Sequence, residues 1–220
     1  MGALVESSFF EVFMPSQAQH PDLESEAAVM DSHRSGNFEV RPLGIEGPLL
    51  IGSRRFGDAR GHFTETYSRR DFTAIGIAEE MVQDNHSFSA QRGTVRGLHF
   101  QLPPRAQAKL VRALRGRILD VAVDIRHGSP SYGRHVAVEL SAENGLMLYI
   151  PAGFAHGFAT LEPDTEVAYK VSDTYAPDCD RGLAWDDPAL GIPWGVAPEA
   201  AVLSDKDRRH PRLAELGRVF

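Results

Sequence analysis

The stretch RGLHFQLPP (residues 96–104), followed at once by QAKLV (residues 107–111), decides how this chain is organised. It places the guanidinium of Arg96, the imidazole of His99 and the ammonium of Lys109 on neighbouring segments of β type. An imidazole can remove a proton at neutral pH, and cations beside it can stabilise the anion that forms. We therefore expect the rest of the chain to close a barrel around a site of proton-transfer chemistry.

Short runs of alternating apolar residues flank this stretch, and Gly, Pro, Asn and Asp separate them. Such spacing is typical of an all-β sandwich or barrel. Strands are expected at residues 49–56, 61–66, 81–85, 94–101, 108–115, 117–125, 135–140, 146–150, 157–161 and 166–171. Only two helices are expected, one over residues 69–75 between a Ser68 cap and Gly76, the other around residues 211–216. Many strands with a few short helices predict a jelly-roll barrel, the double-stranded β-helix.

The strand ILDVAVDI (residues 118–125) has one polar face. Strict alternation places Asp120, Ala122 and Asp124 on one side and aliphatic residues on the other. Taken alone, this strand favours an edge position whose polar face meets water. The alternative is a partly polar barrel interior, in which the same face lines a ligand cavity.

Composition limits the class of protein. The 220-residue chain has a formal net charge of −7, which argues against a nonspecific nucleic-acid binder. We expect one domain, residues 37–220, after a flexible N-terminal extension, residues 1–36, that ends in a polar, linker-like run. The single cysteine, Cys179, excludes an intrachain disulfide and a Cys-based metal site. Without a signal peptide or a membrane-spanning run, a soluble cytoplasmic protein is expected.

Each candidate side chain also has a purely structural interpretation. His99 can be a hydrogen-bonded structural histidine, Lys109 a surface lysine and Tyr169 a core aromatic. Arg96 and His99 are three residues apart, so a regular strand sends them to opposite faces, but Gly97 permits a bulge that turns both inward. If Tyr169 faces His99 across a cavity, its phenol can deliver a proton.

The stretch PAGFAHG (residues 151–157) resembles the second motif of the cupin superfamily, Pro-x-Gly-x-x-His. In metal-binding cupins this histidine joins a His-x-His pair and a Glu. Gln101 stands where the second imidazole of that pair belongs, so a metal-free cupin is predicted. His156 is then left for ligand binding or for a structural hydrogen bond. Arginine-rich segments at residues 54–61 and 206–209 offer donors for a diphosphate.

Many ordered motifs together closely resemble the dTDP-4-dehydrorhamnose 3,5-epimerase family. They run from about Gly44 to Leu216 and include residues 56–65, 83–87, 96–101, 107–111, 120–126, 129–133, 140–144, 151–158, 185–188 and 203–207. The resemblance implies a homodimeric isomerase of deoxysugar biosynthesis that needs no metal or other cofactor. Its substrate would be a dTDP-linked 4-keto-6-deoxyhexose, epimerised at C3, C5 or both through an enolate, and neither nucleic acid nor a membrane would be a partner.

The resemblance also implies roles for individual residues. His99 matches the base, Asp207 the carboxylate that orients it, Lys109 the group that stabilises the enolate, and Tyr169 the acid on the opposite face of the sugar ring. Binding positions for the nucleotide sugar are matched by Arg60, Glu65, Gln83, Asn85, Arg96, His156 and Lys206, with Tyr175 stacking on thymine and Asp180 standing where a binding Glu is usual.

Two further departures from the family pattern leave alternatives open. Thr174 stands where many members have a second Tyr, and the segment from His86 to Arg96 is one residue longer than the commonest pattern. A single-centre 3- or 5-epimerase, or a ketoisomerase of a nucleotide sugar, is therefore one alternative. A non-catalytic cupin that binds a nucleotide sugar is another, and Gln101 disfavours a metal-dependent oxygenase.

Overall fold

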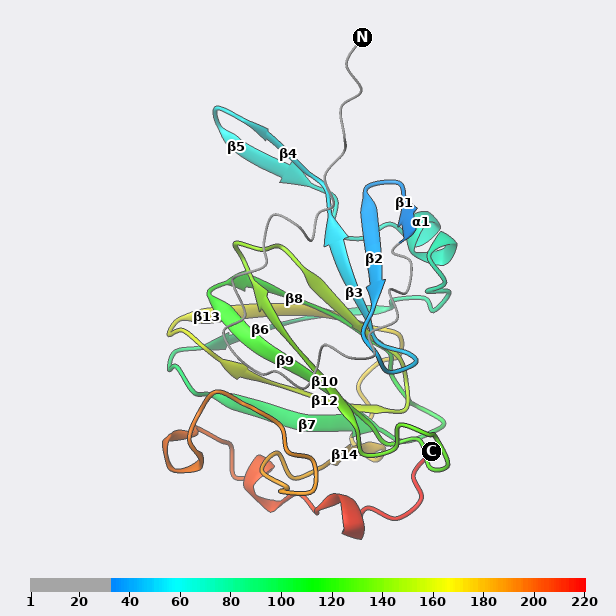
Figure 1. Ribbon diagram of the computed structural model, residues 1–220, viewed down its shortest axis with the longest axis vertical. Coiled ribbons are helices and arrows are strands. Elements are labelled where there is room, and N and C mark those ends of the chain that lie inside the picture. Colours follow the sequence, from blue (N-terminus) through cyan, green and yellow to red (C-terminus); the bar gives the residue numbers. More distant parts are fainter. Residues whose placement is uncertain (1–32) are drawn as a thin grey trace.

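A computed structural model describes residues 33–220 of the chain (Figure 1). Most of the predicted N-terminal extension, residues 1–32, lies outside the described residues. Where the description begins, β1 (His33–Ser35) pairs antiparallel with β2 (Phe38–Pro42). The polar run predicted as a linker therefore ends in a short strand that belongs to the larger sheet.

Two antiparallel sheets face each other and form the predicted jelly-roll barrel (Figure 1). The seven-stranded sheet has the order β1-β2-β3-β11-β8-β13-β6, and the five-stranded sheet has the order β10-β9-β12-β7-β14. The remaining strands of the first sheet are β3 (Leu49–Ser53), β6 (Gln83–Ser89), β8 (Lys109–Arg115), β11 (Met147–Ile150) and β13 (Thr165–Val171). Those of the second are β7 (Val95–Gln101), β9 (Arg117–Asp124), β10 (His135–Ser141), β12 (Phe154–Thr160) and β14 (Asp180–Gly182). The strands β4 (Arg55–Asp58) and β5 (Gly61–Thr64) form a separate two-stranded ribbon that projects from the barrel (Figure 1).

Apolar side chains from both sheets fill the barrel. Val111 and Leu148 of the seven-stranded sheet belong to one buried cluster with Ile118 of the five-stranded sheet. The outer face of the five-stranded sheet is covered by the C-terminal segment, where Trp185 and Trp194 pack. Each fully buried side chain of this size stabilises the fold by roughly 1.5–3 kcal/mol. The five-stranded sheet is therefore buried on both faces.

The first of the two predicted helices is present, and the second is reduced to a short turn. α1 (Arg69–Ala74) follows Ser68, whose hydroxyl accepts a hydrogen bond from the backbone N–H of Asp71, as the predicted cap requires. The helix expected around residues 211–216 shortens to the 3₁₀ turn η3 (Leu213–Glu215). The 3₁₀ turns η1 (Pro198–Ala200) and η2 (Asp207–Arg209) were not predicted, because three residues carry no readable apolar period. Within residues 33–220 no helix is long and apolar enough to cross a membrane.

The favoured interpretation of β9, an edge strand with a wetted polar face, is wrong. β9 lies between β10 and β12, and both Asp120 and Asp124 are completely buried. Asp124 accepts hydrogen bonds from Arg126, Ser129 and Ser131. The alternation of polar and apolar residues did not indicate that both faces of β9 are buried. The residues that cover its aliphatic face belong to the C-terminal segment, which is distant in the sequence. The polar face instead points into a partly polar barrel interior, which was the alternative interpretation.

Candidate active site

His99 lies on β7 beside a β-bulge. The pairing of β7 with β12 shifts there, so that Gly97 and Leu98 lie opposite Gly157 alone. Gly97 has a φ of +127°, and a Cβ at this position would come within 2.6 Å of the Gly157 Cα. The bulge that Gly97 was predicted to permit is confirmed, and the close approach of the two backbones requires glycine.

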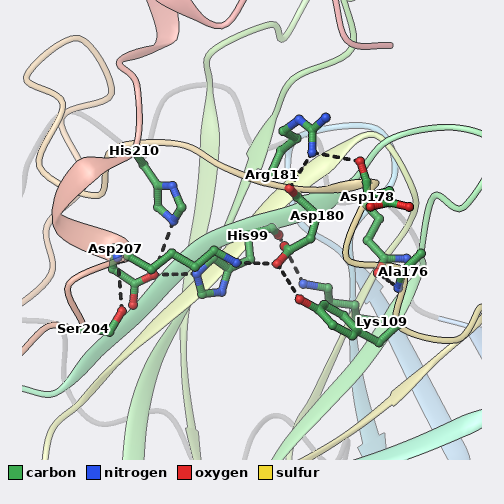
Figure 2. Close-up of polar contacts among 12 residues, drawn as sticks. His99, Lys109, Ala176, Asp178, Asp180, Arg181, Ser204, Asp207 and His210 are labelled. Carbon is green, nitrogen blue, oxygen red and sulfur yellow. Dashed lines mark hydrogen bonds and ion pairs between the residues drawn. The ribbon is translucent and has the colours of Figure 1, made fainter.

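Asp207 lies directly behind the imidazole of His99, from which it is 108 residues away in the sequence. The Nε2 atom of His99 is 2.6 Å from Oδ1 of Asp207 (Figure 2). Burial would raise the pKa of Asp207, but the imidazoles of His210 and His99, together with Ser204, hold it far below its ordinary value. An ionised carboxylate can only accept a hydrogen bond, so Nε2 of His99 is the donor, and in the neutral ring Nδ1 holds the lone pair.

Lys109, the first residue of β8, buries its ammonium beside this pair. Its Nζ donates to the backbone carbonyl oxygen of His99 at 3.2 Å. Burial lowers the pKa of Lys109 to about 8, while the negative charges of Asp120 and Asp180 oppose that shift. Lys109 is therefore mostly a cation at neutral pH, although its side chain is buried.

His156 lies on β12 opposite His99, and its Nε2 is 2.8 Å from Oδ1 of Asp120. Both side chains are buried, and burial lowers the pKa of His156 even though Asp120 opposes the shift. The neutral imidazole therefore donates to the carboxylate. The structure thus shows a hydrogen bond of His156 to Asp120, and ligand binding by His156 stays a prediction.

His99, Lys109 and Tyr169 line one cavity of about 280 Å³. His99 comes from the five-stranded sheet, whereas Lys109 and Tyr169 come from the seven-stranded sheet. Burial raises the pKa of Tyr169, and the positive charge of Arg96 opposes this only in part, so the phenol is protonated at neutral pH. An imidazole and a phenol thus face the same space from the two sheets.

Polar side chains from several segments complete the walls of this cavity. They are Gln83, Asn85, Tyr175, Asp180 and Lys206. The Tyr175 hydroxyl donates to Asp180 at 3.0 Å, and the Lys206 ammonium contacts the same carboxylate. Gln83 donates to Asn85 at 2.8 Å and accepts from the backbone N–H of Tyr175 at 3.3 Å. The walls therefore present ammonium groups, amides, hydroxyls and one carboxylate, that of Asp180, which already contacts Tyr175 and Lys206. This set offers both donors and acceptors to a ligand rich in hydroxyl groups.

Four residues predicted to bind the ligand do not line this cavity: Arg60, Glu65, Arg96 and His156. Arg60 is exposed in the turn of the β4–β5 ribbon. Glu65 accepts a hydrogen bond from Asn37 at 3.0 Å. Arg96, expected to turn inward, is exposed, and its guanidinium donates to Ser89 in β6 at 3.1 Å. Arg96 therefore reaches from one sheet to the edge strand of the other.

Gln101, which stands in place of a cupin metal ligand, uses its amide to hold backbone. Its Nε2 donates to the carbonyl oxygen of Arg105 at 2.6 Å, and its Oε1 accepts from the N–H of Ala176 at 2.7 Å. These bonds fix the segments that lead into β8 and toward β14. The position therefore has a structural use of its own.

His210 is a residue of this region that the sequence reasoning missed. Its Nε2 lies 3.3 Å from Oδ1 of Asp207, and its ring stands perpendicular to that of His99 with 5.5 Å between centroids (Figure 2). The ring packs against Gly182, where a Cβ would lie 2.2 Å from it. The one available signal was spacing, because residues i and i+3 of a 3₁₀ turn lie on the same side.

Comparisons with known proteins agree with this geometry. The family model described as dTDP-4-dehydrorhamnose 3,5-epimerase matches residues 42–215. A curated protein of that name from Sinorhizobium fredii is 55% identical over 79% of this chain and 89% of its own length. A solved structure of a dTDP-4-dehydrorhamnose 3,5-epimerase from Bacillus anthracis with TDP and PPi bound is 46% identical, with a TM-score of 0.77, and covers 80% of this chain and 99% of its own. A dTDP-6-deoxy-D-glucose-3,5-epimerase from Legionella pneumophila in complex with dTDP-4-keto-L-rhamnose is 40% identical, with a TM-score of 0.77 over 81% of this chain and 94% of its own.

Proposed function

The chain belongs to the dTDP-4-dehydrorhamnose 3,5-epimerase family, and from this premise we propose how its own residues carry out the reaction. It is an isomerase that epimerises a dTDP-4-keto-6-deoxyhexose at C3, C5 or both in deoxysugar biosynthesis. The observation that carries the proposal is that His99 and Tyr169 enter one cavity from opposite sheets, with Lys109 beside them.

His99 acts as the general base. Because Nε2 donates to Asp207, the lone pair on Nδ1 is free to take the proton from the carbon next to the C4 carbonyl. The electron pair of that C–H bond moves into the C–C bond, and the carbonyl oxygen becomes an enolate oxygen. The ammonium of Lys109, which lines the same cavity, stabilises this oxygen. Asp207 holds the imidazole in the productive tautomer and stabilises the imidazolium that forms.

Tyr169 acts as the general acid. Its phenol delivers a proton to the opposite face of the planar enolate, which inverts the carbon. The tyrosinate then regains a proton, and the imidazolium of His99 loses one, before the next cycle. The same pair can act at C3 and C5, because both carbons lie next to the C4 carbonyl.

The nucleotide part of the substrate binds to the polar walls of the cavity and its surroundings. Tyr175 is exposed and stacks on thymine, while the ammonium of Lys206 and the guanidinium of Arg96 approach the diphosphate. Gln83, Asn85 and Asp180 bind hydroxyl or base groups. Glu65, which contacts Asn37, and His156, which contacts Asp120, are the remaining predicted binding positions. The single cysteine supports a reducing, cytoplasmic location.

Proton exchange tests the proposed function directly. With dTDP-4-keto-6-deoxyglucose in deuterated buffer, an NMR time course should show deuterium entering C3, C5 or both together with the appearance of epimers. Exchange confined to one carbon would identify a single-centre epimerase, an alternative that the departure at Thr174 leaves open, and a shifted keto group would identify a ketoisomerase. Tight binding of the nucleotide sugar without any exchange would contradict the proposed function.

Replacing Tyr169 with phenylalanine should separate proton removal from inversion. We expect epimer formation to fall by about 10²-fold, because the acid is lost, while exchange at the carbon served by His99 continues at a measurable rate. The ratio of deuterium incorporation to epimer formation, measured in one NMR sample, reports this split. Equal losses of both would contradict the assignment of Tyr169 as the acid on the opposite face.

The active assembly is a homodimer in which the β4–β5 ribbon reaches a second copy. A lone two-stranded ribbon is marginally stable in water, and this one leaves Phe63 69% and Phe56 42% exposed. Arg60, at its turn, does not line the cavity of its own chain. A partner that covers the ribbon buries both phenylalanines and brings Arg60 to the second copy.

Replacing Phe63 with aspartate should dissociate this dimer. We expect the molar mass measured by light scattering to change from that of two chains to that of one, with loss of most epimerase activity. The exposed control Val82→Asp, on a segment outside the ribbon, should leave the mass unchanged. A wild-type protein that is monomeric at assay concentration would contradict the proposal.

A further inference from the structure

Three potential metal ligands meet behind the proposed base. The ring nitrogens of His99 and His210 and a carboxylate oxygen of Asp207 all lie within 4.8 Å of one another. In this group the Nε2–Oδ1 distances are 2.6 Å from His99 and 3.3 Å from His210 (Figure 2). The side chain of His210 is 9% exposed, yet its Nε2 makes no hydrogen bond of acceptable geometry. The ring thus points a buried, unsatisfied nitrogen at a carboxylate that another imidazole already uses.

We propose that His99, Asp207 and His210 form an inhibitory site for a divalent transition cation, with Zn²⁺ as the best-fitting ion. Two imidazoles and one carboxylate are a ligand set that Zn²⁺ prefers. Bonds of about 2.0–2.2 Å in tetrahedral geometry place ligand atoms about 3.3 Å apart. The contact between His210 and Asp207 already has this spacing, and the contact between His99 and Asp207 has to open by less than 1 Å.

A second cavity borders the three proposed ligands at His210. This cavity of about 430 Å³ is also lined by Gly182 and Lys206. The positive charge of Lys206 is compensated by Asp180, which its ammonium contacts. Asp207 supplies the carboxylate of the site, with its Oδ1 2.6 Å from Nε2 of His99 and 3.3 Å from Nε2 of His210. Of the three proposed ligands only His210 lines this second cavity, whose lining also includes Arg181 and Arg209.

Metal binding at this site would prevent His99 from accepting a proton from the substrate. This inference rests on the proposed role of His99. A metal on Nε2 displaces the proton that Nε2 donates to Asp207 in the free protein. In the neutral ring that proton moves to Nδ1, which then has no lone pair to accept a proton from the substrate. The cation also takes the carboxylate that stabilises the imidazolium. Zinc should consequently lower kcat and leave KM nearly unchanged, since it does not occupy the substrate cavity.

Cobalt titration of the full-length protein tests the site without using activity. Co²⁺ added to the wild type should produce visible absorption bands of a four- or five-coordinate complex at one ion per chain, and zinc should bleach them. In His210→Asn, which keeps a polar side chain beside Gly182, the affinity for cobalt should fall by at least about tenfold. A matched variant of an exposed histidine on β1, His33→Asn, should bind as the wild type does. Equal affinity in all three proteins would overturn the proposal.

Steady-state kinetics with zinc chloride then tests the consequence. We expect wild-type kcat to fall at constant KM and to recover on adding EDTA, and we expect His210→Asn to need at least about tenfold more zinc for half inhibition. Inhibition that competes with substrate, or that is equally strong in His210→Asn, would overturn it. If the chain binds cobalt as described but does not epimerise the substrate, the proposed function fails and the metal site stands. If it epimerises but binds no cobalt, only the metal site fails.

Discussion

Replacing His99 with alanine is expected to abolish measurable turnover, with kcat reduced by about 10³- to 10⁴-fold, the upper part of the range for loss of a positioned base. The reason is geometric. His99 is a wall residue of the cavity whose second ring nitrogen is fixed by Asp207, so its loss removes the proton acceptor and leaves the binding walls in place. Deuterium exchange at C3 and C5 should disappear together with epimer formation, while the Kd for dTDP measured by calorimetry should stay within a few-fold of wild type.

The Asp207→Asn variant distinguishes a base–carboxylate unit from two independent residues. An amide at this position can donate to Nε2 of His99 and so favours the tautomer in which Nδ1 is protonated. We expect a large loss of kcat in this variant and no further loss in the double variant with His99→Ala, because groups that act as a unit are not additive. Substantial exchange in His99→Ala would show that the base is another residue, and multiplicative losses in the double variant would show that His99 and Asp207 act independently.

Local sequence patterns predicted most of the barrel but not its short connecting pieces. Each of the ten expected strands has a counterpart with shifted boundaries, because alternation and turn residues report a half-buried strand well, but the one expected over residues 49–56 divides into β3 and β4. β1, β2 and β14 (Asp180–Gly182) were not predicted, and in β14 three residues with two charges and a glycine show no alternation. Its pairing with β7 is nevertheless what brings Asp180 to the cavity. The strand that carries the cavity residue Asp180 therefore could not be predicted from its own sequence.

The meeting of His99 with Asp207 was not readable from the residues either. The two are 108 positions apart and belong to a strand and a 3₁₀ turn that pack only through the tertiary fold. The pairing was expected only through the family resemblance, and the structure places the two side chains in contact. That resemblance assigned no role to His210, and only coordinates reveal that a second imidazole touches the same carboxylate. Distant packing also explains the error at β9, whose aliphatic face is covered by the C-terminal segment.

Replacing Lys109 with methionine is expected to lower kcat by about 10²- to 10³-fold, the usual cost of removing one donor from a developing oxyanion. Methionine retains the length and apolar stem of lysine but cannot stabilise an enolate oxygen. Because the charged ammonium is buried, its removal should leave the free energy of unfolding at neutral pH unchanged or higher. Steady-state kinetics and urea unfolding on the same preparation separate lost chemistry from lost folding. A variant that unfolds at lower urea and loses activity in proportion would contradict this role.

The pH dependence of the wild type gives an independent test of the same group. Burial lowers the pKa of Lys109 from 10.5 to about 8, so kcat should decline as the pH rises through about 8 and the ammonium becomes neutral. The residual activity of Lys109→Met should lack this decline. Stability should change in the opposite direction. Between about 8 and 10.5 the unfolded chain holds the lysine proton and the folded chain does not, so the contribution of Lys109 to the free energy of unfolding increases with pH there. A wild type that keeps its full kcat at a pH high enough to neutralise the Lys109 ammonium would show that another donor stabilises the enolate.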